Sequence, residues 1–402
     1  MSAQSFSSKQ EDLVSLYIHI PFCIKRCNYC DFNTYANRIE LISLYVTALC
    51  NEINQLGKIC NNKVHTIYFG GGTPSFLPVE KYSIIMNDLR RNFKLTSDLE
   101  ISMEVNPGIL FPGFLEEIYS LGFNRLSVGL QSAIPEELAY LGRLHTPLDV
   151  IETIRGARLA GFRNISLDLM FGLPGQSLKS WQESLDFALG LHPTHLSLYS
   201  LTYEKGTRLD KWRHKGLLPN SSEDLGAELY EMAITCLRGN NYLHYEISNW
   251  ALLNVQRESE YICRHNVQYW LNRPYIGIGA GAHSFFGGYR WANLKTIPAY
   301  IQTFSGKEQA EKAFANRKKM PLSQRTQMQE TMWLGLRLLE QGVSNADFKN
   351  RFGISIQDAY NQEINELLKL ELVTWKGREK DYLCLTERGC LLGNQVFLYF
   401  VD

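Results

Sequence analysis

The first half of the chain alternates between six short apolar runs and the segments with helical periodicity that separate them. The runs are rich in β-branched and apolar residues, and they cover residues 16–21, 64–69, 99–105, 125–130, 165–170 and 196–201. The segments between them repeat apolar residues as amphipathic helices do, over residues 41–56, 79–93, 113–121, 148–160 and 178–189. Because this alternation requires right-handed crossovers, it predicts an α/β fold with a parallel sheet, either doubly wound or curled into a barrel.

The second half follows a different pattern. After about residue 210 the alternation stops, and a glycine-rich run covers residues 277–284. From about residue 321 the pattern is helical again, and two short extended runs near 372–375 and 382–385 complete a winged-helix-like arrangement. We therefore expect three parts, joined through a linker at 306–320: a core over residues 1–210, an extension over 211–305, and a mostly helical, winged-helix-like domain over 306–402.

The composition argues against several classes of protein. Lys and Arg together number 41, as do Asp and Glu, so no excess charge indicates binding to nucleic acid. No stretch approaches the roughly 18 consecutive apolar residues that a membrane span needs, and the N-terminal residues are too polar for a signal peptide. We therefore expect a cytoplasmic protein, in which thiols stay reduced and available for metal. A homodimer and peripheral contact with a membrane stay open.

Three cysteines directly after the first apolar run have a spacing typical of an iron–sulfur site. Cys23, Cys27 and Cys30 follow the pattern C-x3-C-x2-C. Three thiolates on one tight loop can hold three irons of a cubane cluster and leave the fourth iron open to another ligand. A zinc site would normally need four ligands in two separated pairs, and the chain has no second C-x2-C. Nine cysteines in 402 residues are too sparse, and odd in number, for a disulfide framework.

Polar and glycine motifs follow the next strands of the predicted sheet. The second run ends in Gly70-Gly-Gly-Thr-Pro74, and Glu104, Gln131 and Asp168 stand at or near the ends of later runs. Chemistry in parallel α/β folds gathers at these strand ends. The glycines let backbone amides approach a ligand closely, but the motif has neither the spacing of a dinucleotide fingerprint nor that of a P-loop. It suits an amino-acid moiety that chelates the open iron.

These motifs together resemble the radical S-adenosylmethionine (SAM) superfamily, in particular its coproporphyrinogen III oxidase-like branch. The resemblance rests on Tyr17-Ile-His-Ile-Pro-Phe-Cys23, the cysteine spacing and the glycine motif, and it extends over almost the whole chain. It implies a partial (β/α)6 TIM-like barrel in which Cys23, Cys27 and Cys30 hold a 4Fe-4S cluster. It also implies that SAM is surrounded by Tyr17, Gly71, Gly72, Thr73, Glu104, Gln131, Arg143 and Asp168.

A later motif, His265-Asn266-Val-Gln-Tyr269-Trp270, is similar to the HNxxYW signature of the heme chaperones in this branch. The similarity implies heme as a ligand, with His265 on the iron and the aromatic residues along the porphyrin. The structural alternative is that His265 caps a turn and the aromatic residues pack in the core. Cys263 and His283 are weaker candidates, and we expect His283 to border the cofactor pocket.

Three functions stay open at this point. The leading one is a heme chaperone that delivers heme to acceptor hemoproteins such as respiratory cytochromes. The alternative is an oxygen-independent coproporphyrinogen III dehydrogenase, which acts by radical oxidative decarboxylation. Members of that kind carry a fourth cysteine two residues after the third, whereas Phe32 stands there in this chain. The third is radical chemistry on an unrelated substrate. Whether the protein is an enzyme stays open, and no residue is predicted to be catalytic.

Overall fold

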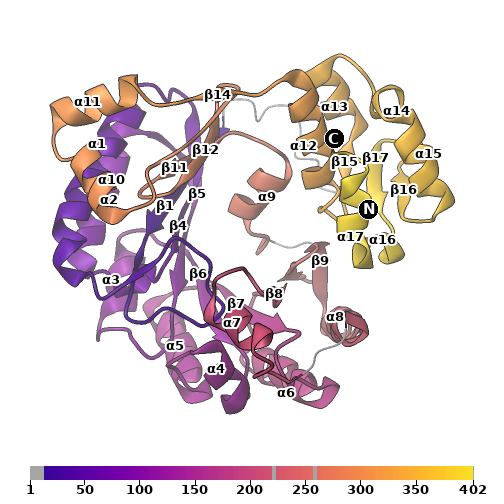
Figure 1. The fold of residues 1–402 in the computed structure, drawn as a ribbon, viewed down its shortest axis with the longest axis horizontal. Coiled ribbons are helices and arrows are strands. Elements are labelled where there is room, and N and C mark those ends of the chain that lie inside the picture. Colours follow the sequence, from indigo (N-terminus) through magenta and orange to yellow (C-terminus); the bar gives the residue numbers. More distant parts are fainter. Residues whose placement is uncertain (1–12, 220–222, 257–259, 402) are drawn as a thin grey trace.

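The computed structural model describes residues 13–219, 223–256 and 260–401 (Figure 1). A twelve-stranded sheet forms its centre, and six parallel neighbours in it form the predicted partial (β/α)6 barrel. In spatial order these strands are β1 (Leu13–Ile20), β4 (Lys63–Gly71), β5 (Lys94–Val105), β6 (Arg125–Gln131), β7 (Asn164–Phe171) and β8 (His195–Ser200).

Helices between the strands cover one face of this sheet and leave a polar face inside. They are α1 (Ile42–Gly57), α2 (Val79–Asn92), α3 (Phe114–Ser120), α4 (Pro135–Leu141), α5 (Pro147–Ala160) and α6 (Leu178–Gly190). Strand residues on the covered face, such as Ile18, Phe69 and Leu167, are fully buried in the apolar core. The residues that alternate with them are polar and contact one another across neighbouring strands, among them Tyr17, Tyr68, Glu104, Ser127 and Asp168. The two-residue period of a strand thus separates the core from the site.

Further strands extend the sheet at both edges. Beside β1 lie, in order, β11 (Tyr275–Ile278), β12 (His283–Phe286), β13 (Tyr289–Ala292) and β14 (Met320–Pro321). Beside β8 lie β10 (Asn249–Leu252) and β9 (Tyr242–Glu246), which α7 (Arg208–His214) and α8 (Glu223–Gly239) precede in the chain. A separate short pair joins β2 (Phe22–Cys23) to β3 (Tyr35–Ala36).

The predicted linker at 306–320 is wrong. A helix, α11 (Lys307–Ala315), occupies most of it, follows α10 (Ile297–Thr303) and packs on α1. Its charged residues face solvent while Ala310 is buried, which explains why its composition looked like that of a linker. The boundaries expected near residues 210 and 306 stay predictions.

The C-terminal part is a helical unit with a small sheet, at the upper right of Figure 1. Its helices are α12 (Gln324–Gly335), α13 (Asn345–Phe352), α14 (Ile356–Ala359), α15 (Asn361–Lys369), α16 (Glu387–Leu391) and α17 (Gly393–Leu398). Its strands pair in the order β15 (Val343–Ser344), β17 (Tyr382–Leu385), β16 (Val373–Lys376). Leu336, Phe348 and Ile364 belong to an apolar core of its own. The predicted helices followed by a hairpin are confirmed. Among the described residues, no helix is both long and apolar enough to cross a membrane.

Candidate functional site

The three predicted cluster cysteines lie on a compact loop after β1. Cys23 ends β2, and the pairing of β2 with β3 closes the segment that carries Cys27 and Cys30. The backbone amide of Asn28 donates to the carbonyl of Leu141 at 2.9 Å, so the loop is anchored on the end of α4. The fold therefore places the three cysteines on one loop that is anchored at both β2 and α4.

Each of these thiols has a polar partner. The pairs are Cys23 with Thr73 at 3.6 Å, Cys27 with Arg143 at 3.7 Å and Cys30 with Thr34 at 3.8 Å. The hydroxyl of Thr73 and the guanidinium of Arg143 donate to sulfur. Donors of this kind stabilise the thiolate, which is the form that binds metal, and they tune the potential of an iron–sulfur cluster.

Burial shifts the pKa of two of these thiols. Burial raises the pKa of Cys23 to about 11 and also raises the pKa of Cys30, so both are protonated in the absence of metal. A metal that coordinates them would remove those protons. In a cubane cluster each thiolate would hold a different iron, which is the arrangement that the C-x3-C-x2-C spacing predicts.

The glycine motif brings the ends of β4 and β5 into close contact. The backbone amide of Gly71 donates to Oε2 of Glu104 at 3.0 Å, and the Tyr68 hydroxyl donates to Oε1 at 3.2 Å. Gly71 has a φ of +117°, and a Cβ there would lie 2.5 Å from the ring of His19. A Cβ on Gly70 would lie 2.9 Å from Oε1 of Glu104. Only glycine permits this approach of the strands.

Two half-buried carboxyl groups lie on the polar face of the sheet. Burial raises the pKa of Glu104 to about 7, while the amide of Gly71 lowers this pKa and the carboxyl of Asp168 raises it. Burial also raises the pKa of Asp168, whose oxygens accept from the hydroxyl of Ser127 at 2.9 and 2.8 Å. Carboxyl groups with pKa values shifted by burial are typical of binding and catalytic sites.

Arg143 connects the cysteine loop to the ends of β5 and β6. Its Nη2 donates to Oδ1 of Asn106 at 2.6 Å and to the carbonyl of Gly129 at 3.0 Å, while its Nη1 faces the sulfur of Cys27. Gln131, the last residue of β6, has a left-handed backbone with a φ of +67°. The predicted SAM residues therefore gather at the carboxyl ends of neighbouring strands, as expected for a parallel sheet.

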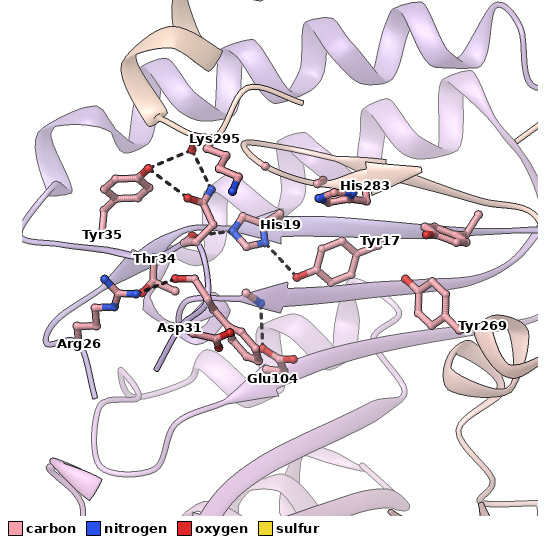
Figure 2. A pocket seen from close by; sticks show the side chains of 16 residues that line it. Tyr17, His19, Arg26, Asp31, Thr34, Tyr35, Glu104, Tyr269, His283 and Lys295 are labelled. Carbon is pink, nitrogen blue, oxygen red and sulfur yellow. Dashed lines mark hydrogen bonds between the residues drawn. The ribbon is translucent and has the colours of Figure 1, made fainter. Parts of the chain in front are cut away.

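A cavity of about 670 Å³ opens at these strand ends (Figure 2). Three of the predicted SAM residues, Tyr17, Gly71 and Glu104, line it. The other lining residues come from β1, the cysteine loop, β3, α9 (Arg264–Trp270), β11, the start of β12 with the run before it, and the chain after β13; they are His19, Arg26, Asp31, Phe32, Asn33, Thr34, Tyr35, Tyr269, Tyr275, Gly281, Ala282, His283 and Lys295. The cavity thus joins the predicted SAM site to the later motif.

The remaining predicted SAM residues lie around this cavity rather than on it. Thr73 and Arg143 line a smaller cavity of about 40 Å³ beside Cys27. Gly72, Gln131 and Asp168 line neither of these two cavities. Their roles as SAM contacts stay predictions.

His265 lies on α9 and is buried, with a partner at each ring nitrogen. Thr66 donates its hydroxyl proton to Ser15 at 2.6 Å, so its oxygen accepts from Nδ1 of His265 at 2.8 Å. Nε2 then accepts from the hydroxyl of Tyr269 at 3.1 Å. Burial lowers the pKa of His265 to about 3, with smaller contributions from neighbouring cations, so the ring is neutral. Tyr269 lines the cavity, and His265 stands behind it.

The structure separates the two weaker candidates. Cys263 is fully buried and its sulfur lies 3.9 Å from Oε1 of Glu100, away from the lining of the large cavity. His283 is exposed and lines that cavity, as expected.

His19, Tyr275 and Lys295 are among the cavity residues that the sequence analysis did not single out. His19 donates from Nε2 to the carbonyl of Asn33 at 2.9 Å and accepts at Nδ1 from the hydroxyl of Tyr17 at 3.0 Å. A signal for His19 was present, since it stands two residues after Tyr17 on one strand and therefore on the same face. No comparable signal marked the other two residues, because strands far apart in sequence bring them to the cavity.

Comparisons with known proteins agree with this geometry. A model of the radical SAM superfamily matches residues 17–188, and a model of the HemN C-terminal domain matches residues 322–392. The heme chaperone HemW of Bacillus subtilis is 38% identical over 389 residues, which cover 96% of this chain and 99% of that protein. The heme chaperone HemW of Lactococcus lactis is 33% identical over 96% of this chain and 97% of its own length. The chain belongs to the HemW family.

A solved structure confirms the fold of this HemW family member. Coproporphyrinogen III oxidase (HemN) from Escherichia coli, described as a radical SAM enzyme, superimposes with a TM-score of 0.80. The match covers 97% of this chain and 90% of that one at 24% identity, so it supports the architecture alone. Membership in the radical SAM superfamily implies a 4Fe-4S cluster and SAM as cofactors, and the cysteine loop and the strand ends described above fit both groups.

Proposed function

We propose that this protein binds heme and delivers it to acceptor hemoproteins such as respiratory cytochromes. The observation that carries the proposal is the similarity, over nearly the whole chain, to proteins named heme chaperone HemW. The cavity of about 670 Å³ supports it, because cavities of this size hold one ligand as large as a cofactor. Two aromatic lining residues outside the predicted SAM set, Tyr269 and Tyr275, suit a flat apolar ring.

The proposal includes both implied cofactors. Cys23, Cys27 and Cys30 would hold the 4Fe-4S cluster, and Arg143, which donates to the sulfur of Cys27, would connect the cluster to the SAM site. The SAM contacts would be drawn from the predicted set of Tyr17, Gly71, Gly72, Thr73, Glu104, Gln131, Arg143 and Asp168. When bound, the cluster and SAM supply one-electron chemistry. The residues of the chain bind and orient these groups.

His265 enters the proposal as the heme ligand that the HNxxYW motif predicts. Its Nδ1 donates to the hydroxyl oxygen of Thr66, as the second nitrogen of a metal-binding histidine usually donates to a fixed acceptor. Its Nε2 is covered by the hydroxyl of Tyr269, so coordination requires that this hydroxyl move away. In the conformation described, His265 holds Tyr269 at the cavity wall.

Heme transfer tests the proposal directly. Protein loaded with one equivalent of heme is mixed with an apocytochrome, and the spectrum of the acceptor is followed. We expect the acceptor to gain heme faster from the loaded protein than from free heme at the same concentration. Failure of the protein to bind heme, or to pass it on, would contradict the proposal.

An anaerobic assay separates this function from the alternative. The reconstituted protein is incubated with dithionite, SAM and coproporphyrinogen III, and decarboxylated products are measured. We expect none, because Phe32 stands at the position of the fourth cysteine and its side chain is 61% exposed. Conversion of coproporphyrinogen III would favour the dehydrogenase instead.

The cluster is tested by iron content. We expect Cys27→Ser to lose the visible absorption and the iron of the reconstituted protein. The matched control is Cys236→Ser, since Cys236 is a half-buried free cysteine on α8, outside the loop. Equal iron content in Cys27→Ser and Cys236→Ser would show that the cysteine loop does not hold the cluster.

A further inference from the structure

His283 is the histidine of the cavity whose ring is open to a ligand. It begins β12, directly after the glycine-rich run, and its side chain is exposed at the cavity. Among the described residues no side-chain hydrogen bond or ion pair involves it. In Figure 2 its imidazole lies above Tyr17 in the view, and the side chain of Lys295 lies further to the left, above His19. Both of its ring nitrogens are therefore available, unlike those of His265.

The backbone that carries His283 is held firmly from α1. The amide of Gly279 donates to Oε2 of Glu52 at 3.0 Å, and the amide of Ala280 donates to the hydroxyl of Tyr45 at 2.9 Å. The side-chain amide of Asn33 donates to the carbonyl of Ala280 at 3.0 Å, which ties the run to the cysteine loop. The run therefore presents a free imidazole on a fixed backbone, as a metal-binding site requires.

The charged groups around His283 favour a ligand with carboxylates. Lys295 and Arg26 line the cavity as cations, and in the described part of the chain the ammonium of Lys295 makes no ion pair with an acid. Arg26 donates from Nη2 to the carbonyl of Phe32 at 3.3 Å and keeps its other donors. The acids of the cavity are Asp31 and Glu104, and burial raises the pKa of Glu104 to about 7, which reduces its negative charge near neutral pH.

We propose that His283 coordinates the iron of the heme held in this cavity, with Lys295 and Arg26 on the porphyrin carboxylates. The inference rests on the proposed heme binding. Imidazole is a common axial ligand of heme iron, and a free imidazole in an open cavity can coordinate without breaking an internal hydrogen bond. His265, by contrast, must first lose the hydroxyl of Tyr269. The geometry therefore assigns first contact with the iron to His283.

Heme titration of matched variants tests this inference. Hemin is added to wild type, His283→Ala, His265→Ala and His214→Ala, and the Soret band and the dissociation constant are measured. His214 is an exposed histidine on α7, outside the cavity lining, and serves as the control. Because loss of even an indirect partner of a metal ligand costs about 10–100-fold in affinity, we expect His283→Ala to weaken binding at least tenfold and to shift the Soret band. Added imidazole should restore the wild-type spectrum.

The outcomes separate the two levels of the proposal. If wild type does not bind hemin, the proposed function fails and the inference falls with it. If wild type binds and His283→Ala has the same spectrum and affinity, the inference alone is wrong. Circular dichroism and the variant His283→Gln guard against misfolding, and we expect both variants to fold because the side chain is exposed.

Discussion

At the scale of single residues, the site depends on close approaches that few side chains permit. Glu104 accepts from the amide of Gly71 and from the hydroxyl of Tyr68, and its carboxyl group is withdrawn from bulk solvent. The same contacts fix its orientation toward the cavity. The sequence motif identified these residues as neighbours of a ligand, but the shift in the pKa of Glu104 follows from tertiary burial and had no sequence signal.

The raised pKa of Glu104 predicts a pH-dependent stability. The folded protein holds this proton up to about pH 7, whereas the unfolded chain releases it near the ordinary glutamate pKa of 4.5. The stability that the protonated group contributes is therefore present below the unfolded pKa and is lost as the pH rises through the folded one. We expect the free energy of unfolding of the metal-free wild type to fall between pH 5 and 8 relative to that of Glu104→Gln. Urea denaturation measures it, and parallel pH profiles would contradict the assignment.

Gly71→Ala tests the close approach at the end of β4. The new Cβ would meet the ring of His19 at 2.5 Å and would sit on a backbone with a φ of +117°. We expect a loss of about 1–3 kcal/mol in the free energy of unfolding, which is the usual cost of such a strained backbone. The control is Gly190→Ala, because nothing lies within 4 Å of its Cβ. If Gly71→Ala and Gly190→Ala have equal effects in urea denaturation, Gly71 does not approach the ring of His19 as closely as described.

At the scale of elements, the alternation of runs and helices was sufficient to predict the six parallel strands and their helices. It failed where strands are short and their pairing is distant. The strands β11 to β14 were not predicted, because each has at most four residues; glycines interrupt the chain between β11 and β13, and two helices lie between β13 and β14. The burial of His265 was not predicted either. The orientation of α9 depends on its packing beside β4 and on Glu100, which accepts from the amide of His265, rather than on local periodicity.

Substitution of Glu52 on α1 tests whether this side chain holds the glycine-rich run (residues 277–284) in place. It is fully buried and accepts from the amide of Gly279, from Tyr300 at 2.7 Å and from Arg317 at 2.7 Å. Removal of one partner of a buried ion pair leaves the other charge uncompensated, so we expect Glu52→Ala to lose about 3–5 kcal/mol. Thermal and urea denaturation measure this loss.

A surface ion pair provides the matched control for Glu52. Glu308→Ala removes the exposed pair with Lys312 on α11, which should cost only about 0.3–0.5 kcal/mol. If Glu52→Ala and Glu308→Ala lose similar stability, Glu52 does not hold the glycine-rich run. The claim that this run keeps the backbone of His283 in a fixed position would then be contradicted.

At the scale of the whole molecule, one cavity joins parts of the chain that lie far apart in sequence. The cysteine loop, the strand ends, α9 and the run before β12 all contribute residues to it. The C-terminal unit approaches this region through α12, which packs against α9, and through Asn272, whose side chain donates to Thr331 at 3.2 Å. A single cavity therefore lies where the predicted SAM site and the predicted heme motif meet.

The most direct test of this account is the position of iron in crystals of the anaerobically reconstituted protein with heme. Anomalous diffraction at the iron edge should show a cluster bound to Cys23, Cys27 and Cys30 and a separate single iron inside the cavity, beside His283. Heme iron outside the cavity, or an absence of iron at the three cysteines, would contradict the account.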